Sequence, residues 1–208
     1  MPAHVVDHPL AADRLAILRD RSTAPAAFRA ALKDLSTMLV YEACRDLPTV
    51  ESVVHTPLSP ARARRPRSSP LLVPVLRAGL GMLDGALVLL PDSPVGFVGL
   101  KRDEETLLPD SYVTAIPGGV RGQRAIVLDP MLATGGSLLH TLRLLLDAGL
   151  TTISVCCVLA APEGLDAVAT AGFGRVPVVT AAVDCRLNEV GFIVPGLGDA
   201  GDRQFGIC

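Results

Sequence analysis

Apolar residues near the N-terminus recur with the spacing of an amphipathic helix. One such pattern runs from Ala26 to Cys44, and Pro25 suits the first turn of the helix that it predicts. A shorter helical pattern precedes it, from Leu10 to Leu18. The apolar face of the longer pattern is formed by Phe28, Leu32, Leu35 and Leu39. We therefore expect two helices at the start of the chain.

A strand-like run from Val50 to Thr56 leads into a segment of different character, SPARARRPRSSP. The segment between Arg62 and Arg67 mixes arginines with proline and shows no apolar face. We interpret it as an exposed loop or the tip of a hairpin. A solvated surface is the simpler explanation for its charge, and binding of an anionic effector is the alternative.

The central part alternates short apolar runs with helical patterns, which predicts an α/β fold with a parallel sheet covered by helices. The runs lack polar alternation, as strands buried on both faces do. Adjacent Cys156 and Cys157 should point to opposite faces of one strand. The expected strands are LLVPVL, VGFVGL, AIVL, ISVCCVLA and VPVVTAAV, and the expected helices are Gly79 to Leu90, Gly136 to Ala148 and Pro162 to Ala171.

The last segment, GFIVPGLGDAGDRQFG, is rich in glycine and has no sustained period. We expect it to be an ordered loop. A loop of this length within a compact domain usually has a functional reason.

Between AIVL and the helix that starts at Gly136 lies the sequence DPMLATGGS, from Asp129 to Ser137. Glycines let the backbone approach an anion, the N-terminus of the helix favours negative charge, and the hydroxyls of Thr134 and Ser137 can donate hydrogen bonds. Asp129 stands at the carboxyl end of a parallel strand, where open α/β sheets bind ligands. The pattern fits a phosphate-binding loop. The alternative is an ordinary helix capped by Thr or Ser.

Composition narrows the class of protein. The chain has 208 residues, 50% of them hydrophobic, which suits one domain, 1–208, with its core at about 70–180. A net charge of −2 provides no general basic field for nucleic acid or a membrane surface. The five cysteines show no CxxC spacing, and the sequence shows no leader or membrane pattern. Both observations favour a location of the protein in the cytoplasm. The GxxxxGK[ST] motif is absent, and the four histidines show no catalytic spacing.

Eight short motifs give the chain a specific resemblance over nearly its whole length. They are HPL (8–10), YEA (41–43), PVLRAGLGM (74–82), RDEETL (102–107), LDPMLATGGS (128–137), AAPEG (160–164), LNE (187–189) and PGLGDAGD (195–202). With these motifs the chain resembles the uracil phosphoribosyltransferases, a family of type I phosphoribosyltransferases. The resemblance implies the type I fold: a mostly parallel central sheet flanked by helices, with a small hood from the C-terminal segment and the N-terminal helices.

The resemblance also implies the site for 5-phosphoribosyl 1-diphosphate. Arg77 and Arg102 would hold the diphosphate, and Asp129 would face the ribose hydroxyls. These three form the expected catalytic set. The loop residues expected to bind this substrate are Asp129, Pro130, Met131, Leu132, Ala133, Thr134, Gly135, Gly136 and Ser137. From the residues alone, Arg77 could form a surface salt bridge and Arg102 could be a solvated charge, although burying Arg77 in its apolar stretch would require a partner.

Uracil would be read mainly by backbone groups of four residues, Ile193, Gly198, Asp199 and Ala200. Asp199 would also face the sugar diphosphate or the water ligands of Mg²⁺, whereas Asp202 is expected to be structural. Phe192 stands where the family often has Tyr. Mg²⁺ is the expected cofactor and would be held by the diphosphate and water, with no direct protein ligand.

The expected reaction forms UMP and diphosphate from uracil and 5-phosphoribosyl 1-diphosphate, a step of pyrimidine salvage. The family implies a homo-oligomer and a GTP effector. Two alternatives stay open: an enzyme for another base, such as hypoxanthine or guanine, and a non-catalytic regulator that binds RNA.

Overall fold

The computed structural model describes residues 3–102 and 109–206. Its centre is an eight-stranded sheet in the order β1-β10-β9-β7-β4-β5-β6, with β8 paired to β9. β5 and β6 pair antiparallel, and the other described pairings of this sheet are parallel. The strands are β1 (Ala3–Val5), β4 (Leu71–Leu76), β5 (Phe97–Arg102), β6 (Pro109–Ala115), β7 (Arg124–Leu128), β8 (Met131–Leu132), β9 (Thr152–Ala160) and β10 (Val178–Val183).

The predicted α/β class and parallel sheet are confirmed. Three strands of the sheet, β1, β6 and β8, were not expected from the pattern. β1 comes from the N-terminus, outside the stretch of about 70–180 expected to form the core, and extends the sheet by pairing with β10. With three residues it is too short to show a period.

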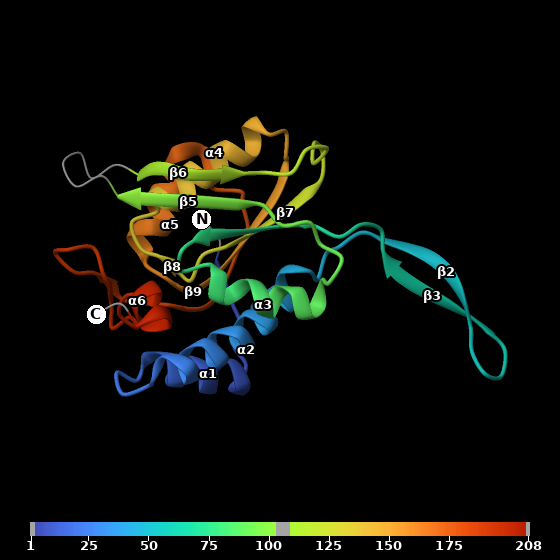
Figure 1. Cartoon of the computed structure of the whole chain (residues 1–208), viewed down its shortest axis with the longest axis horizontal. Helices are drawn as coiled ribbons and strands as arrows, with labels where there is room; N and C mark the ends of the chain where they lie inside the picture. Colours follow the sequence, from blue (N-terminus) through green and yellow to red (C-terminus); the bar gives the residue numbers. More distant parts are fainter. Residues whose placement is uncertain (1–2, 103–108, 207–208) are drawn as a thin grey trace.

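Helices cover both faces of the sheet (Figure 1). One layer contains α1 (Pro9–Arg19), α2 (Pro25–Ala43) and α3 (Leu80–Leu89), and the other contains α4 (Gly136–Asp147) and α5 (Pro162–Val168), the last continuing into a π-helical turn at Ala169–Phe173. Cys156 packs in the core with α1–α3, and Cys157 packs in the core with α4 and α5. The predicted division of the two cysteines between opposite faces is confirmed.

The amphipathic face predicted for the long N-terminal helix is also confirmed. Phe28, Leu32, Leu35 and Leu39 of α2 are all buried. In α4, Leu138, Leu142 and Leu145 are buried, whereas Leu146 is 45% exposed.

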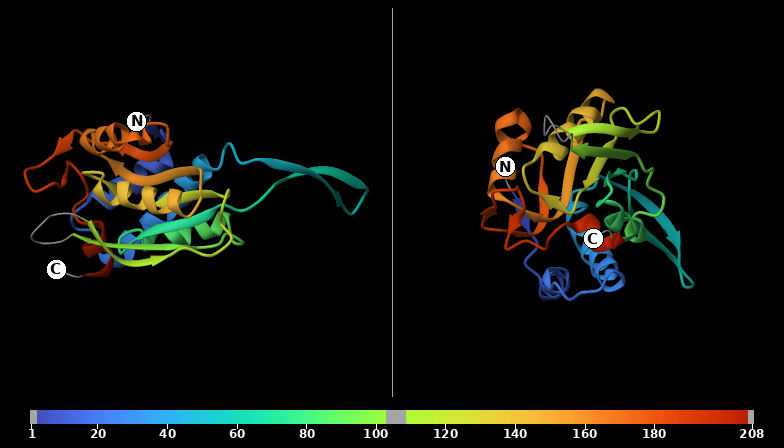
Figure 2. Two further views of the ribbon diagram at one scale, coloured as in Figure 1. Left: turned by 90° about the horizontal axis from the view of Figure 1, so that it is seen from above. Right: turned by 60° about the vertical axis from the view of Figure 1, so that its left-hand side comes forward.

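A two-stranded hairpin projects from the body (Figures 1 and 2). It consists of β2 (Thr49–His55) and β3 (Pro60–Pro66), paired antiparallel. The segment from Arg62 to Arg67 is therefore largely a strand, and its interpretation as a loop or hairpin tip is wrong. In β3 the alternating residues Ala61 and Ala63 are partly buried while the arginines are exposed. Small alanines gave no apolar signal, which is why the period of two was missed.

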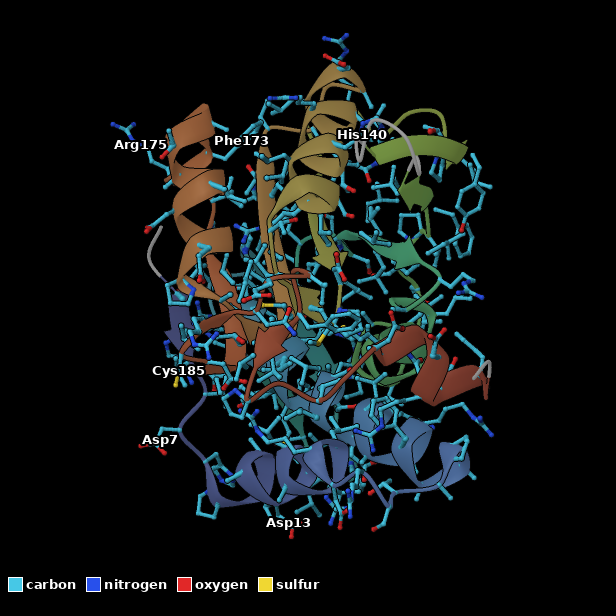
Figure 3. The ribbon with its side chains drawn as sticks, turned by 90° about the vertical axis from the view of Figure 1, so that its left-hand side faces the viewer. Asp7, Asp13, His140, Phe173, Arg175 and Cys185 are labelled. Atoms are coloured by element: carbon cyan, nitrogen blue, oxygen red, sulfur yellow. The ribbon has the colours of Figure 1, made fainter. Side chains whose placement is uncertain are left out.

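The C-terminal segment is only partly a loop. It contains β12 (Ile193–Val194), which pairs antiparallel with the preceding strand β11 (Arg186–Leu187), and the helix α6 (Ala200–Phe205). The expectation of an unbroken loop is wrong because Asp199 caps α6, its carboxylate accepting a hydrogen bond from the Asp202 N–H at 2.9 Å. In Figure 3 this segment crosses between α1 and α2 below and α4 and α5 above.

The carboxyl ends of β4 and β5 point toward the side where α6 lies, and the hairpin projects from the opposite end of the molecule (Figure 1). The edge of the sheet where ligands are expected therefore lies beside the C-terminal segment. No helix in the described ranges is long and apolar enough to cross a membrane.

Candidate active site

The predicted phosphate loop lies between β7 and α4. Gly135, the residue before α4, has a left-handed φ of 83°, and no side chain caps the helix. The alternative of an ordinary Thr or Ser cap is therefore not found in the structure. The N-terminal turn of α4 instead presents backbone N–H groups and a favourable dipole to an anion.

The loop is held by close packing against the start of α5. A Cβ atom on Gly135 would lie 3.1 Å from the carbonyl oxygen of Gly164, and one on Gly164 would lie 2.3 Å from the carbonyl oxygen of Ala133. Only glycine fits at position 164 without moving the phosphate loop. This contact gives the motif AAPEG a structural role that its sequence did not reveal.

Asp129 follows β7 directly. Its backbone N–H donates to the Cys156 carbonyl at 3.1 Å, and its carboxylate accepts from the Met131 N–H at 3.4 Å. Burial raises the pKa of Asp129 to about 7, and the hydrogen bond from Met131 opposes this shift. The carboxyl group is thus close to its titration point at neutral pH. Donors such as ribose hydroxyls would stabilise its charged form.

Arg77 follows β4, the neighbour of β7 in the sheet. A Cβ atom on Gly79 would lie 2.4 Å from the Leu128 carbonyl oxygen, so this turn packs closely against the end of β7. The Arg77 side chain is 56% exposed, with its guanidinium 3.8 Å from the Asp202 carboxylate. Arg77 is therefore not buried, and its described contact is the surface salt bridge that the sequence left open as an alternative. It lies at the edge of the sheet where an anion would bind.

Arg102 is the last residue of β5, and β5 lies beside β4. Its backbone is therefore on the same edge of the sheet as Arg77. The side chain of Arg102, and the part of RDEETL from 103 to 107, fall outside the described residues.

A cavity of about 280 Å³ lies between the phosphate loop and the C-terminal segment. Met131 and Ala133 line it from the loop. The four residues expected to bind uracil line it from the other side; they are Ile193, Gly198, Asp199 and Ala200. The structure thus brings together residues that are about 60 positions apart in the sequence. The volume of the cavity suits a single-ring base.

Several lining residues were not predicted. They are Ala78, Val190, Gly191, Phe192 and Gly201. Ala78 follows Arg77, so the arginine turn reaches the cavity as well.

A larger cavity of about 590 Å³ lies elsewhere, between β1, α1 and α2, and is lined by none of the predicted site residues.

The segment from 187 to 192 is shaped by two side chains whose role the sequence did not show. The Asn188 side-chain oxygen accepts from the N–H groups of Val190 at 3.1 Å and Phe192 at 2.8 Å. A carboxylate oxygen of Glu163 accepts from the Leu187 N–H at 2.9 Å. Asn often forms turns of this kind, so the residue type at position 188 is the signal from which this turn could have been predicted.

The described residues contain no group of three or more His, Cys, Asp or Glu side chains that could hold a metal ion. Figure 3 places His140 on α4, well away from α6. The described groups at this edge of the sheet are the Arg77 guanidinium, the partly buried Asp129 carboxylate and the backbone groups of the phosphate loop.

A phosphate loop at the carboxyl edge of a parallel sheet, facing a small cavity under a C-terminal segment, is the arrangement of the type I phosphoribosyltransferases. The chain is similar to a solved structure of the protein AQ2163 from Aquifex aeolicus, with a TM-score of 0.93 and 39% identity over 99% of each chain. It shares the fold of adenine phosphoribosyl transferase from Trypanosoma brucei, with a TM-score of 0.57 and 15% identity over 87% of this chain and 83% of the other.

The comparisons of sequence are more specific. The family model of uracil phosphoribosyltransferase matches residues 5–207. Proteins named uracil phosphoribosyltransferase from Corynebacterium diphtheriae and Corynebacterium glutamicum are 52% and 51% identical over 206 residues, covering 99% of this chain and 97% of each relative. The chain belongs to the uracil phosphoribosyltransferase family.

Proposed function

We propose that this chain transfers ribose 5-phosphate from 5-phosphoribosyl 1-diphosphate to N1 of uracil, giving UMP and diphosphate in pyrimidine salvage. The observation that carries the proposal is the cavity in which the phosphate loop faces the segment from Ile193 to Ala200. In a member of this family, that geometry supports a sugar phosphate on one side and a pyrimidine on the other.

The sugar phosphate would bind to the loop from Asp129 to Ser137. The uncapped N-terminus of α4 would hold the 5-phosphate through backbone N–H groups. Asp129, next to the end of β7, would accept hydrogen bonds from the ribose hydroxyls. Those hydrogen bonds would favour the charged form of Asp129 and so oppose the effect of burial, which raises its pKa to about 7.

Uracil is flat and presents alternating carbonyl and N–H groups along its edge. Backbone groups of Ile193, Gly198 and Ala200 would read that edge, and the small side chains of Gly198 and Ala200 let the main chain come close. Asp199 uses one carboxylate oxygen to cap α6, which leaves its other oxygen for the sugar diphosphate or for water. The Phe192 side chain would offer an apolar contact to the ring.

The reaction requires charge separation at the anomeric carbon. The C–O bond to diphosphate breaks with its electron pair leaving on the diphosphate, N1 of uracil bonds to the carbon, and the N1 proton is released. Arg77 and Arg102 would stabilise the charge that grows on the leaving group, as guanidinium groups remain charged and donate in pairs. No covalent intermediate with the protein is required, and positioning supplies much of the rate.

The cofactor proposed for this step is Mg²⁺. With one carboxylate in the loop and no three-residue acidic cluster among the described residues, the ion fits best on substrate oxygens and water. Bound there, it would neutralise part of the diphosphate charge. The chain itself would contribute Asp129 and Asp199 as acceptors for water ligands.

Mixing the protein with uracil, 5-phosphoribosyl 1-diphosphate and Mg²⁺ tests the proposal directly. UMP should form, and hypoxanthine, guanine and cytosine should give little or no nucleotide. Absence of UMP, or a preference for a purine, would refute it. Tight, salt-sensitive RNA binding without UMP formation would support the alternative of a regulator.

The proposal includes a single domain spanning 1–208, a cytoplasmic homo-oligomer as the working form, and GTP as an effector. The single domain rests on length and composition, the cytoplasm on the cysteine pattern, and the homo-oligomer and the GTP effector on the family alone. Sedimentation of the full chain and rates measured with and without GTP test the last two.

A further inference from the structure

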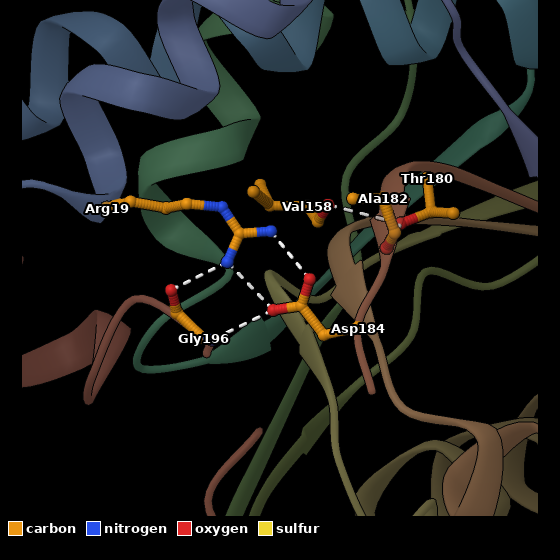
Figure 4. A network of polar contacts seen from close by, with 6 residues as sticks. All are labelled: Arg19, Val158, Thr180, Ala182, Asp184 and Gly196. Carbon is orange, nitrogen blue, oxygen red and sulfur yellow. Dashed lines mark hydrogen bonds and ion pairs between the residues drawn. The ribbon is translucent and has the colours of Figure 1, made fainter. Parts of the chain in front are cut away.

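The turn at Gly196 lies between Ile193 and Gly198, two of the residues expected to bind uracil. It is held by a pair of charged side chains from distant parts of the chain. Arg19, the last residue of α1, donates to both carboxylate oxygens of Asp184, at 2.8 and 2.6 Å, in a two-pronged ion pair. Arg19 also donates to the Gly196 carbonyl at 2.8 Å, and Asp184 accepts from the Gly196 N–H at 2.8 Å. Figure 4 shows this network. Both backbone groups of Gly196 are thus bound by the pair.

The pair is well shielded from water. The Asp184 side chain is 5% exposed and that of Arg19 is 25% exposed. Burial by itself raises the pKa of Asp184, but hydrogen bonds from Arg19 and Gly196 and the charge of Arg19 outweigh it and lower the pKa below its ordinary value. Asp184 therefore remains charged at neutral pH and accepts strong hydrogen bonds.

A second arginine holds the next peptide group. Arg203 of α6 donates to the Leu197 carbonyl at 2.8 Å and to the Leu18 carbonyl, and it lies over the Phe28 ring, 4.5 Å from its centre. Two consecutive carbonyls, those of Gly196 and Leu197, are therefore each bound by a guanidinium group. Both contacts connect the turn to the N-terminal helices.

The geometry of this turn requires glycine at position 196. Gly196 has a φ of 65°, and a Cβ atom there would lie 2.1 Å from the Ile193 carbonyl oxygen. Gly198, two residues later, already lines the cavity, as do Asp199 and Ala200. A rotation of the peptide at Gly196 would therefore move the backbone groups that face the base.

We propose that Arg19 and Asp184 are positioning residues for the pyrimidine: by fixing both backbone groups of Gly196, they orient the main chain from Gly198 to Ala200 toward the base. This inference rests on the proposed function. Neither side chain lines the cavity. They act through the turn, and the hydrogen bonds described for the pair go to each other and to Gly196, not to the phosphate loop on the opposite wall.

The variants Asp184→Asn and Arg19→Gln test this in the full chain. Asp184→Asn keeps the shape but loses the charge and one of the two acceptor oxygens. We expect the KM for uracil to rise about tenfold or more, because the neutral amide holds the Gly196 N–H and the Arg19 guanidinium more weakly than the carboxylate does. The KM for 5-phosphoribosyl 1-diphosphate should change less than about twofold. Arg19→Lys, which keeps the charge but not the paired donors, should be intermediate.

Arg14→Gln is the matched control, since Arg14 lies on the same helix and its guanidinium pairs with Asp34 of α2 at 3.3 Å, away from the turn. It should leave the KM for uracil unchanged. A pair that only stabilised the fold would lower the amount of active enzyme without separating the two KM values. Equal effects on both substrates, or an unchanged KM for uracil in Asp184→Asn, would overturn the proposal.

Hydrogen exchange separates this inference from the proposed function. In Asp184→Asn, amides in the stretch 196–200 should exchange faster than in the wild type, while those of the phosphate loop should not change. This holds whether or not the wild type forms UMP. Absence of UMP would refute the proposed function, and unchanged exchange at 196–200 would refute the positioning role.

Discussion

The Gln204 side chain donates a hydrogen bond to the Ala78 carbonyl at 3.0 Å, which connects α6 to the turn that carries Arg77. The same amide nitrogen donates to the Ala200 carbonyl at 2.7 Å, and Gln204 is fully buried. Ala78 and Ala200 both line the cavity. One side chain therefore links the wall expected to bind uracil with the turn expected to bind diphosphate.

Replacing Gln204 with Met should impair both halves of the site. Methionine has a similar volume but leaves the Ala78 and Ala200 carbonyls without their donor, at a cost of about 1–3 kcal/mol in the free energy of unfolding. We expect KM to rise for both substrates, in contrast to Asp184→Asn. Steady-state kinetics with each substrate varied checks this, and an effect confined to uracil would contradict it.

Arg77→Ala should lower kcat/KM for 5-phosphoribosyl 1-diphosphate by roughly 10²-fold or more, because a preorganised charge on the leaving group is lost. The side chain is 56% exposed, so the free energy of unfolding should change by no more than about 0.5 kcal/mol. Asp202→Asn is the control: it removes the exposed ion-pair partner at 3.8 Å and should affect activity little. Near-normal turnover in Arg77→Ala would remove Arg77 from the site.

Asp129→Asn should reduce turnover by roughly 10²-fold, since a neutral amide accepts hydrogen bonds from ribose hydroxyls less strongly than a carboxylate. Its KM for uracil should change less than its KM for the sugar diphosphate. Initial rates with each substrate varied measure both. An active Asp129→Asn enzyme would show that another group holds the ribose.

The same substitution should change how stability depends on pH. Because burial raises the pKa of Asp129 to about 7 from 3.8, the folded protein binds more protons than the unfolded chain between these values. The wild type without ligand should thus lose stability as pH rises through that window. Asp129→Asn lacks this loss, so its gain in Tm over the wild type should be larger at about pH 8 than at about pH 5. Equal gains at both pH values would contradict the raised pKa.

Gly135→Ala should weaken the phosphate site and the fold together. Its φ of 83° is unfavourable for alanine, and the new Cβ would lie 3.1 Å from the Gly164 carbonyl oxygen. We expect a loss of about 1–3 kcal/mol in the free energy of unfolding and a higher KM for 5-phosphoribosyl 1-diphosphate. Gly119→Ala, with a φ of 78° and no atom within 4 Å of its Cβ, should cost about 1–2 kcal/mol without affecting KM.

Patterns that repeat over a whole element were read correctly from the sequence. The helix containing Phe28, Leu32 and Leu35 was predicted because its apolar face extends over about three turns. The strand of Cys156 and Cys157 was predicted because a parallel strand buried on both faces is apolar throughout. Short elements such as α6, with six residues, and β1, with three, were missed. The strands β3 and β6 have seven residues each and were missed because their sequences lack a clear apolar run.

By itself the sequence determined the parallel α/β class, the position of the phosphate loop, and, through its resemblance to a family, the residues expected to line the site. Only the tertiary structure decided that Met131 faces Gly198 across one cavity, and that Arg19 reaches Asp184 over 165 positions of chain. The physical reason is the range of the interactions. Period and turn chemistry act between neighbours in sequence, whereas a buried ion pair depends on which distant elements packing brings within about 3 Å.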